Sequence, residues 1–125
     1  MIRHVDSIVL RAGDLAAVVA FYRAVGVPLE EERHDDGPLH FACELGPIHF
    51  AVYGADAPGA APRRRDGGAS QVGFQVDSLE AVFSAAVEVG ATVLLEIEDV
   101  PWGRRALVTD PDGRTVEFNQ GPAST

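Results

Sequence analysis

The chain contains two segments that follow one pattern. Residues 7–18 and 71–82 each alternate between apolar and other residues and then continue with apolar residues at helical spacing. Both helical stretches end in the same pair, at Val25-Gly26 and at Val89-Gly90. A glycine-bounded strand then closes each half, at 46–54 and at 113–121. An internal repeat of this size predicts two similar folding units.

The predicted elements come in the same order in both units. In the first unit Asp14 is a good helix N-cap and Gly26 a good helix end. In the second unit Ser78 caps a helix that runs through Glu88. Alternation and turn residues predict strands at 4–11, 28–33, 39–45, 48–53, 71–76, 92–97, 104–109 and 114–119. The sequence therefore predicts an α+β fold of two β-α-β-β-β modules.

Composition and the repeat together predict where the modules begin and end. The whole chain, residues 1–125, has the length of one domain. Module one is expected at 1–54 and module two at 70–121, because these ranges hold the two copies of the pattern. The stretch 55–69 is rich in Gly, Ala and Pro and is interpreted as a linker, followed at the far end by a tail at 122–125.

Charge and composition exclude several classes of partner. The formal net charge of -9 repels phosphates and argues against nucleic acid. No apolar run approaches the length of a membrane span, so we expect no membrane partner. The single Cys43 excludes an intrachain disulfide. Because the first residues lead directly into a strand pattern, we expect no signal peptide and a cytoplasmic protein.

Several motifs together resemble one known superfamily. They are Asp14-Leu15, Phe21-Tyr22-Arg23-Ala24-Val25-Gly26, Phe74-Gln75-Val76-Asp77, Pro101-Trp102-Gly103, and Asp110-Pro111-Asp112-Gly113 followed by Glu117. In these motifs the chain resembles the vicinal oxygen chelate superfamily of glyoxalases, bleomycin resistance proteins and extradiol dioxygenases. The resemblance implies curled, cup-shaped mixed sheets with helices on the outside. It also implies a homodimer, often with the small-molecule site shared between the subunits.

The resemblance also supplies a test for a metal site. Metal-dependent members carry ligands on the first and last strands of each module, which correspond here to Ser7, Gln71, Glu117 and, if Gly46 is aligned with Gly113, Phe50. Ser and Gln are poor ligands for a transition metal, so only Glu117 is an ordinary one. A one-residue slip in the strand would replace Phe50 by His49. The sequence favours no cofactor, and leaves a divalent metal (Zn, Ni, Mn or Fe) on Glu117, His49 and Gln71 as the alternative.

Alternation predicts which side chains line the cup. The apolar residues Ile8, Leu10, Val72, Phe74, Val76, Val116 and Phe118 should face the helices. The residues between them should face the cup: Ser7, Arg11, Gln71, Gly73, Gln75, Thr115, Glu117 and Asn119. The cup is therefore expected to be lined by neutral polar groups with one carboxylate.

Trp102 permits two interpretations. It either packs against a hairpin as a structural aromatic residue, or forms a flat platform on which a planar ligand stacks. The resemblance suggests the second role, which a Pro-Trp-Gly segment has in the bleomycin-resistance branch. The leading hypothesis is therefore a protein that sequesters an aromatic or cationic compound without a metal. Its expected ligand-binding residues are Ser7, Gln71, Gly73, Trp102, Glu117 and Asn119.

Two other functions remain open on the sequence alone. One is a metal-dependent lyase, isomerase or dioxygenase, in which the metal would polarise substrate oxygens and Glu117 could also act as a base. The other is a structural or regulatory module with a vestigial cup.

Overall fold

The structure is a computed structural model that describes residues 1, 3–33, 36–54 and 67–121. Its elements are β1 (Ser7–Arg11), α1 (Leu15–Ala24), β2 (Glu30–Glu32), β3 (His40–Leu45), β4 (Ile48–Tyr53), β5 (Gly67–Gln75), α2 (Leu79–Glu88), β6 (Val93–Val100), β7 (Gly103–Thr109) and β8 (Arg114–Gln120). Residues 55–66 of the predicted linker and the predicted tail at 122–125 lie outside the described residues.

Both helices begin and end where the sequence predicts. The Asp14 carboxylate accepts a hydrogen bond from the backbone N–H of Ala17, and the Ser78 hydroxyl does the same for Ala81. Just beyond the helix ends, Gly26 and Gly90 have φ of 106° and 93°, in the region that favours glycine. Each helix has ten residues, and no helix in the described part of the chain has the length and apolar character needed to cross a bilayer.

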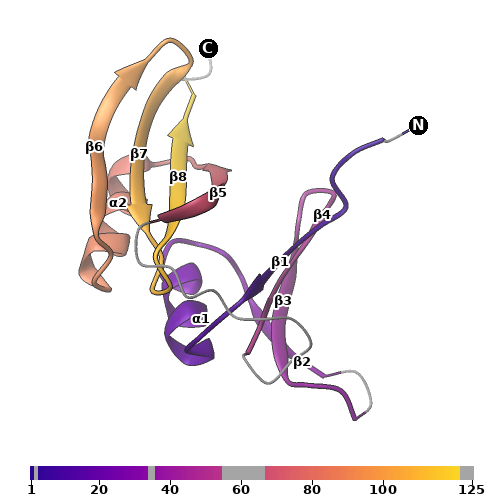
Figure 1. Ribbon diagram of the computed structural model, residues 1–125. Helices are drawn as coiled ribbons and strands as arrows, with labels where there is room; N and C mark the ends of the chain where they lie inside the picture. Colours follow the sequence, from indigo (N-terminus) through magenta and orange to yellow (C-terminus); the bar gives the residue numbers. More distant parts are fainter. Residues whose placement is uncertain (2, 34–35, 55–66, 122–125) are drawn as a thin grey trace.

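The two halves form two sheets of the same topology (Figure 1). The first sheet has the strand order β1-β4-β3-β2 and the second sheet the order β5-β8-β7-β6. In each, the strand before the helix pairs in parallel with the last strand of its module, and the remaining pairs are antiparallel. The predicted α+β arrangement of two β-α-β-β-β modules is therefore confirmed. The sheets are open and mixed.

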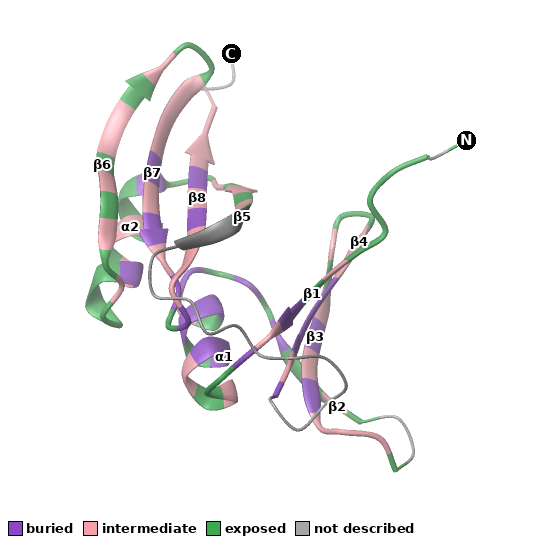
Figure 2. Cartoon of the chain, viewed as in Figure 1, coloured by how far each residue is buried: buried purple, intermediate pink, exposed green. Residues whose placement is uncertain are grey.

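One hydrophobic core joins the two modules. It contains Phe50 and Val52 from the first sheet, Val116 and Phe118 from the second, and Tyr22 from α1 between them. Figure 1 places α1 where the two sheets converge, and Figure 2 shows buried segments on α1 and on the parts of β7 and β8 nearest to it. The helix-covered faces of both sheets therefore contribute to one core, while the two sheets remain separate.

A buried polar cluster also holds the modules together. The Tyr22 hydroxyl donates to Asp110 Oδ2 at 2.7 Å, and Arg114 Nη1 donates to the same oxygen at 2.8 Å and to Asp112 Oδ2 at 3.2 Å. Arg114 Nη2 also donates to the backbone oxygen of Arg11, at the end of β1. We call Tyr22, Asp110, Asp112 and Arg114 the inter-module clamp, because it joins α1 and β1 to the turn between β7 and β8.

The clamp explains the Asp-Pro-Asp-Gly turn. Asp110 Oδ1 accepts from the backbone N–H groups of Asp112 and Arg114, and Gly113 has a φ of 86°. Burial raises the pKa of the Tyr22 hydroxyl well above its ordinary value of 10.0, and the adjacent Asp110 carboxylate raises it further. The turn that carries the family resemblance is therefore a structural joint on the helix side of the sheets.

Candidate functional site

The strand register brings most of the predicted site residues onto one surface. On β5 and β8, Gln71 pairs with Thr115, Gly73 with Glu117 and Gln75 with Asn119. Val116 and Phe118, which alternate with these residues, are fully buried. We call the surface formed by Gln71, Gly73, Gln75, Thr115, Glu117 and Asn119 the second open face. Its predicted orientation, away from the helix, is confirmed.

Glu117 and Gln71 are joined at the centre of this face. Gln71 Nε2 donates to Glu117 Oε1 at 2.6 Å. Gly73 pairs directly with Glu117 and has no side chain to cover the carboxylate. This amide–carboxylate pair offers a ligand one free carboxylate oxygen and the amide oxygen of Gln71, both of which are acceptors. It can accept hydrogen bonds from ligand hydroxyl or amine groups.

Trp102 lies at the edge of the same face and is half exposed, with 52% of its surface accessible. Its indole Nε1 donates to Asn119 Oδ1 at 3.1 Å. The guanidinium carbon of Arg105 lies 5.9 Å from the centre of the indole ring, and Arg105 Nε donates to Glu98 at 3.0 Å. The indole is thus held in one orientation at its rim while much of it remains open to solvent. Arg105 and Glu98 were not among the predicted site residues, although Arg105 follows the Pro-Trp-Gly segment closely.

Ser7 and His49 lie on the other sheet. Ser7 pairs with His49, Val9 with Ala51 and Arg11 with Tyr53, and these residues alternate with the buried Leu10, Phe50 and Val52. We call the side of the sheet that carries Ser7, Val9, Arg11, His49 and Tyr53 the first open face; Ala51 lies on the same side and is buried. His49 Nδ1 lies 2.6 Å from Glu44 Oε1 on the neighbouring strand. The structure therefore does not bring Ser7 together with Gln71 and Glu117 within one chain.

The alignment of Phe50 with Glu117 is wrong. Phe50 is fully buried in the core, and the residue equivalent to Glu117 by register is Ala51. The physical reason is the length of the turns. Pro47 separates Gly46 from β4, whereas Gly113 leads directly into β8, so aligning the two glycines shifts the register by one residue. That shift places His49 on the first open face.

The metal alternative can be tested against these positions. Within the described part of the chain, no three His, Cys, Asp or Glu side chains form a group that could hold a metal ion. Glu117 and Gln71 lie together on the second sheet, but His49 is on the first sheet and pairs with Glu44. The residues of one chain therefore do not fit the Glu117, His49 and Gln71 ligand set.

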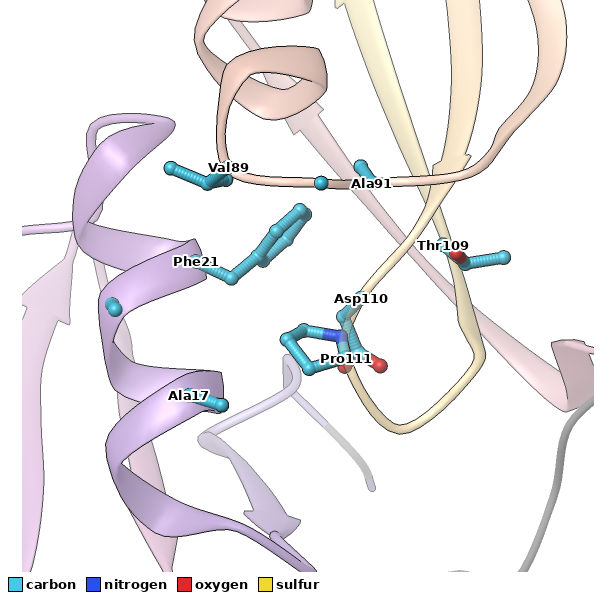
Figure 3. Close-up of a pocket in the computed structure, with 9 residues that line it drawn as sticks. Ala17, Phe21, Val89, Ala91, Thr109, Asp110 and Pro111 are labelled. Carbon is cyan, nitrogen blue, oxygen red and sulfur yellow. The ribbon is translucent and has the colours of Figure 1, made fainter.

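Two cavities are present in the described part of the chain. One, of about 270 Å³, is bounded by α1, the segment after α2 and the turn between β7 and β8. In Figure 3 the Phe21 ring extends from α1 toward Val89 and Ala91 across this cavity. The other, of about 390 Å³, lies between the sheets beside β1 and β5. It is lined mostly by apolar groups such as Ile8 and Phe74, and also by Gly73 and Gln75 of the second open face. Neither cavity is lined by Trp102 or Glu117.

Comparisons with known proteins agree with this architecture. Residues 4–118 match the family described as Glyoxalase/Bleomycin resistance protein/Dioxygenase superfamily. A comparison with curated protein sequences gives no match. Among solved structures, TnmS3, an antibiotic binding protein from Streptomyces sp. CB03234, is 25% identical with a TM-score of 0.69, over 97% of this chain and 98% of that one.

Two further structures share the fold. TioX from Micromonospora sp. ML1 is 24% identical with a TM-score of 0.69, over 96% of this chain and all of that one. The genomically encoded fosfomycin resistance protein FosX from Listeria monocytogenes is 18% identical with a TM-score of 0.72, over all of this chain and 96% of that one.

Proposed function

The chain belongs to the Glyoxalase/Bleomycin resistance protein/Dioxygenase superfamily, and we propose that within it this protein binds and sequesters a planar aromatic small molecule without a catalytic metal. The proposed binding residues are Trp102, Asn119, Glu117, Gln71 and Gly73 on the second open face, with Ser7 on the first. Proteins of this superfamily carry unrelated chemistries on one scaffold, so the proposal depends on these side chains and not on the fold.

The observation that carries the proposal is the state of Trp102. A tryptophan that served only to pack a hairpin would be mostly covered, yet about half of this side chain is accessible. Its hydrogen bond to Asn119 fixes the ring in the absence of a ligand. A fixed, exposed aromatic surface binds a planar ring at low entropic cost. The neighbouring Gln71–Glu117 pair adds hydrogen-bond acceptors that would orient the ligand.

We propose that the complete site forms between two copies of the chain. The two open faces belong to different sheets, and we infer that a ligand on Trp102 of one copy reaches the first open face of a second copy. The half-exposed apolar side chains Val9 on β1 and Leu94 on β6 support such an arrangement, since a partner would cover them. The resemblance to dimeric superfamily members points the same way.

TnmS3 supports the class of ligand. It is an antibiotic binding protein, it is 25% identical, and each chain covers nearly all of the other. Arg105 narrows the choice further, because its guanidinium already occupies a position near the indole ring. A second cation on Trp102 would be repelled there. We therefore expect this face to bind an aromatic ligand whose ring carries no positive charge more tightly than a cationic one.

Fluorescence of the single Trp102 tests the proposal. Saturable quenching by planar polycyclic compounds, in protein treated with EDTA, is expected. The matched control is Trp102→Phe, which should fold normally and bind more weakly when measured by calorimetry. Absence of binding by any compound in a panel of anthraquinones, phenazines and acridines would contradict the proposal.

A further inference from the structure

The two open faces differ most where the repeat aligns a charged residue with a neutral one. If Ser7 is equivalent to Gln71, the register makes Arg11 equivalent to Gln75 and Ala51 equivalent to Glu117. The first open face therefore lacks the central carboxylate of the second and has an arginine where the second has an amide. Ala51 is itself buried, with 1% of its surface exposed, and Arg11 is half-buried at the edge of the sheet.

Arg11 is held by a row of stacked side chains that crosses the first sheet. The strand register aligns Arg11 with Tyr53, Tyr53 with His40 and His40 with Glu32. The Arg11 guanidinium carbon lies 4.9 Å from the centre of the Tyr53 ring, and that ring stacks on His40 at 4.2 Å with an interplanar angle of 7°. His40 is only 2% exposed, so the row is supported from a buried end.

The guanidinium of Arg11 keeps its donors available. Three other arginines are half-buried like Arg11, and each of them pairs with a carboxylate: Arg104, Arg105 and Arg114. Among the described residues, the Arg11 guanidinium lies over the Tyr53 ring and has no carboxylate within 4.0 Å. Glu32, in the same row, is three strands away, or roughly 14 Å at the usual strand spacing. At that distance an exposed pair is largely screened.

A half-buried guanidinium that is held against an aromatic ring and has free donors is a binding group for an oxyanion. Arginine presents parallel N–H donors that match the two oxygens of a carboxylate or sulfonate, and stacking on an aromatic ring holds it without using those donors. Its position is fixed from the backbone as well, since the Arg11 carbonyl accepts from Arg114 of the inter-module clamp.

We propose that Arg11 binds an oxyanion group of the ligand and that Tyr53 positions it, so the protein selects planar aromatic acids over their uncharged analogues. This inference rests on the proposed function, because the aromatic part of the same ligand would stack on Trp102 of the second copy. It assigns the two halves different tasks. The second open face binds the ring, and the first open face binds the acid group.

Matched probes separate the two tasks. Anthraquinone-2-carboxylate and anthraquinone-2-carboxamide have the same ring system and differ in charge, and both are titrated while Trp102 fluorescence is followed. We expect the carboxylate to bind about tenfold more tightly, as for a charge-assisted pair compared with a neutral one. Arg11→Gln should remove that preference and leave carboxamide binding unchanged. The control Arg33→Gln, at an exposed arginine, should retain the preference.

The variant should fold, because glutamine occupies the equivalent position in module two as Gln75. Equal affinity of the unmodified protein for both probes, or an Arg11→Gln protein that still prefers the carboxylate, would overturn the inference while leaving the proposed function intact.

A second readout does not depend on Trp102. The side-chain Nε–Hε NMR signal of Arg11, assigned by its loss in Arg11→Gln, should shift with the carboxylate and not with the carboxamide at constant ionic strength. If neither probe quenches Trp102, the proposed function fails, and a shift of this signal still supports Arg11 as an oxyanion group. No shift with the carboxylate overturns the inference in either case.

Discussion

Removing the Tyr22 hydroxyl tests the inter-module clamp directly. In Tyr22→Phe the ring still fills the core against Phe50, at a centroid distance of 5.5 Å, but Asp110 Oδ2 loses one of its two donors. The Asp110 side chain is fully buried, so water cannot replace the lost donor. A hydrogen bond to a buried charged group contributes about 1.5–3 kcal/mol. We expect the free energy of unfolding at pH 7 to fall by about 2 kcal/mol.

The same variant has a second signature at high pH. The pKa of the Tyr22 hydroxyl is raised on folding, so above pH 10 the folded chain holds a proton that the unfolded chain releases. Stability from this group is complete below pH 10 and is lost as pH rises toward the folded pKa. The difference between the unmodified protein and Tyr22→Phe should therefore shrink by about 1.4 kcal/mol per pH unit above 10.

Urea unfolding at pH 7, 9, 10.5 and 11.5 measures both effects. The control is Tyr53→Phe, which keeps its stacked ring and should change the unfolding free energy by less than about 0.5 kcal/mol. A loss below about 0.5 kcal/mol in Tyr22→Phe at pH 7 would refute the argument for the clamp. A difference that stays constant from pH 9 to 11.5 would refute the assigned direction of the pKa shift.

Three further predictions concern ligand binding, backbone strain and metal binding. Trp102→Leu should weaken binding of a planar aromatic compound roughly tenfold by calorimetry, because stacking contributes about 1–1.5 kcal/mol, while the midpoint of urea unfolding changes little. Gly103→Ala should lower the free energy of unfolding by roughly 3 kcal/mol or more, because the φ of Gly103 is 136° and a Cβ there would collide with the Gln120 backbone. Gly90→Ala is the matched control: a Cβ there would point into open space, so we expect a loss of about 1 kcal/mol. Calorimetry with Zn, Ni, Mn and Fe(II) should detect no stoichiometric site that is lost in Glu117→Ala.

Much of the fold follows from local patterns in the sequence. Alternation on β1 and β8 correctly predicted that Ile8 and Phe118 face the helices and that Ser7 and Glu117 do not. These predictions held because each strand has one buried face, where a slip of one residue would expose the whole apolar set. The helix caps were equally readable, because Asp14 and Ser78 satisfy backbone donors within their own turns.

The site was harder to predict because it depends on relations between segments. Pro47 adds one residue after Gly46, and this local difference moved Phe50 into the core and His49 onto the open face. The pairing of Arg105 with Trp102 and Glu98 depends on the register of β6 against β7, which is interrupted by irregularities. The separation of Ser7 and His49 from Gln71 and Glu117 depends on how the chain divides into two sheets, and no motif carries that information.

The central claim is that this protein binds an aromatic ligand on Trp102 without a metal. The most direct measurement is the fluorescence of EDTA-treated protein during titration with anthraquinone-2-carboxylate, with and without added Zn, Ni, Mn or Fe(II). We expect saturable quenching of the same amplitude and midpoint in all cases. Quenching that requires an added metal and is lost in Glu117→Ala would contradict it.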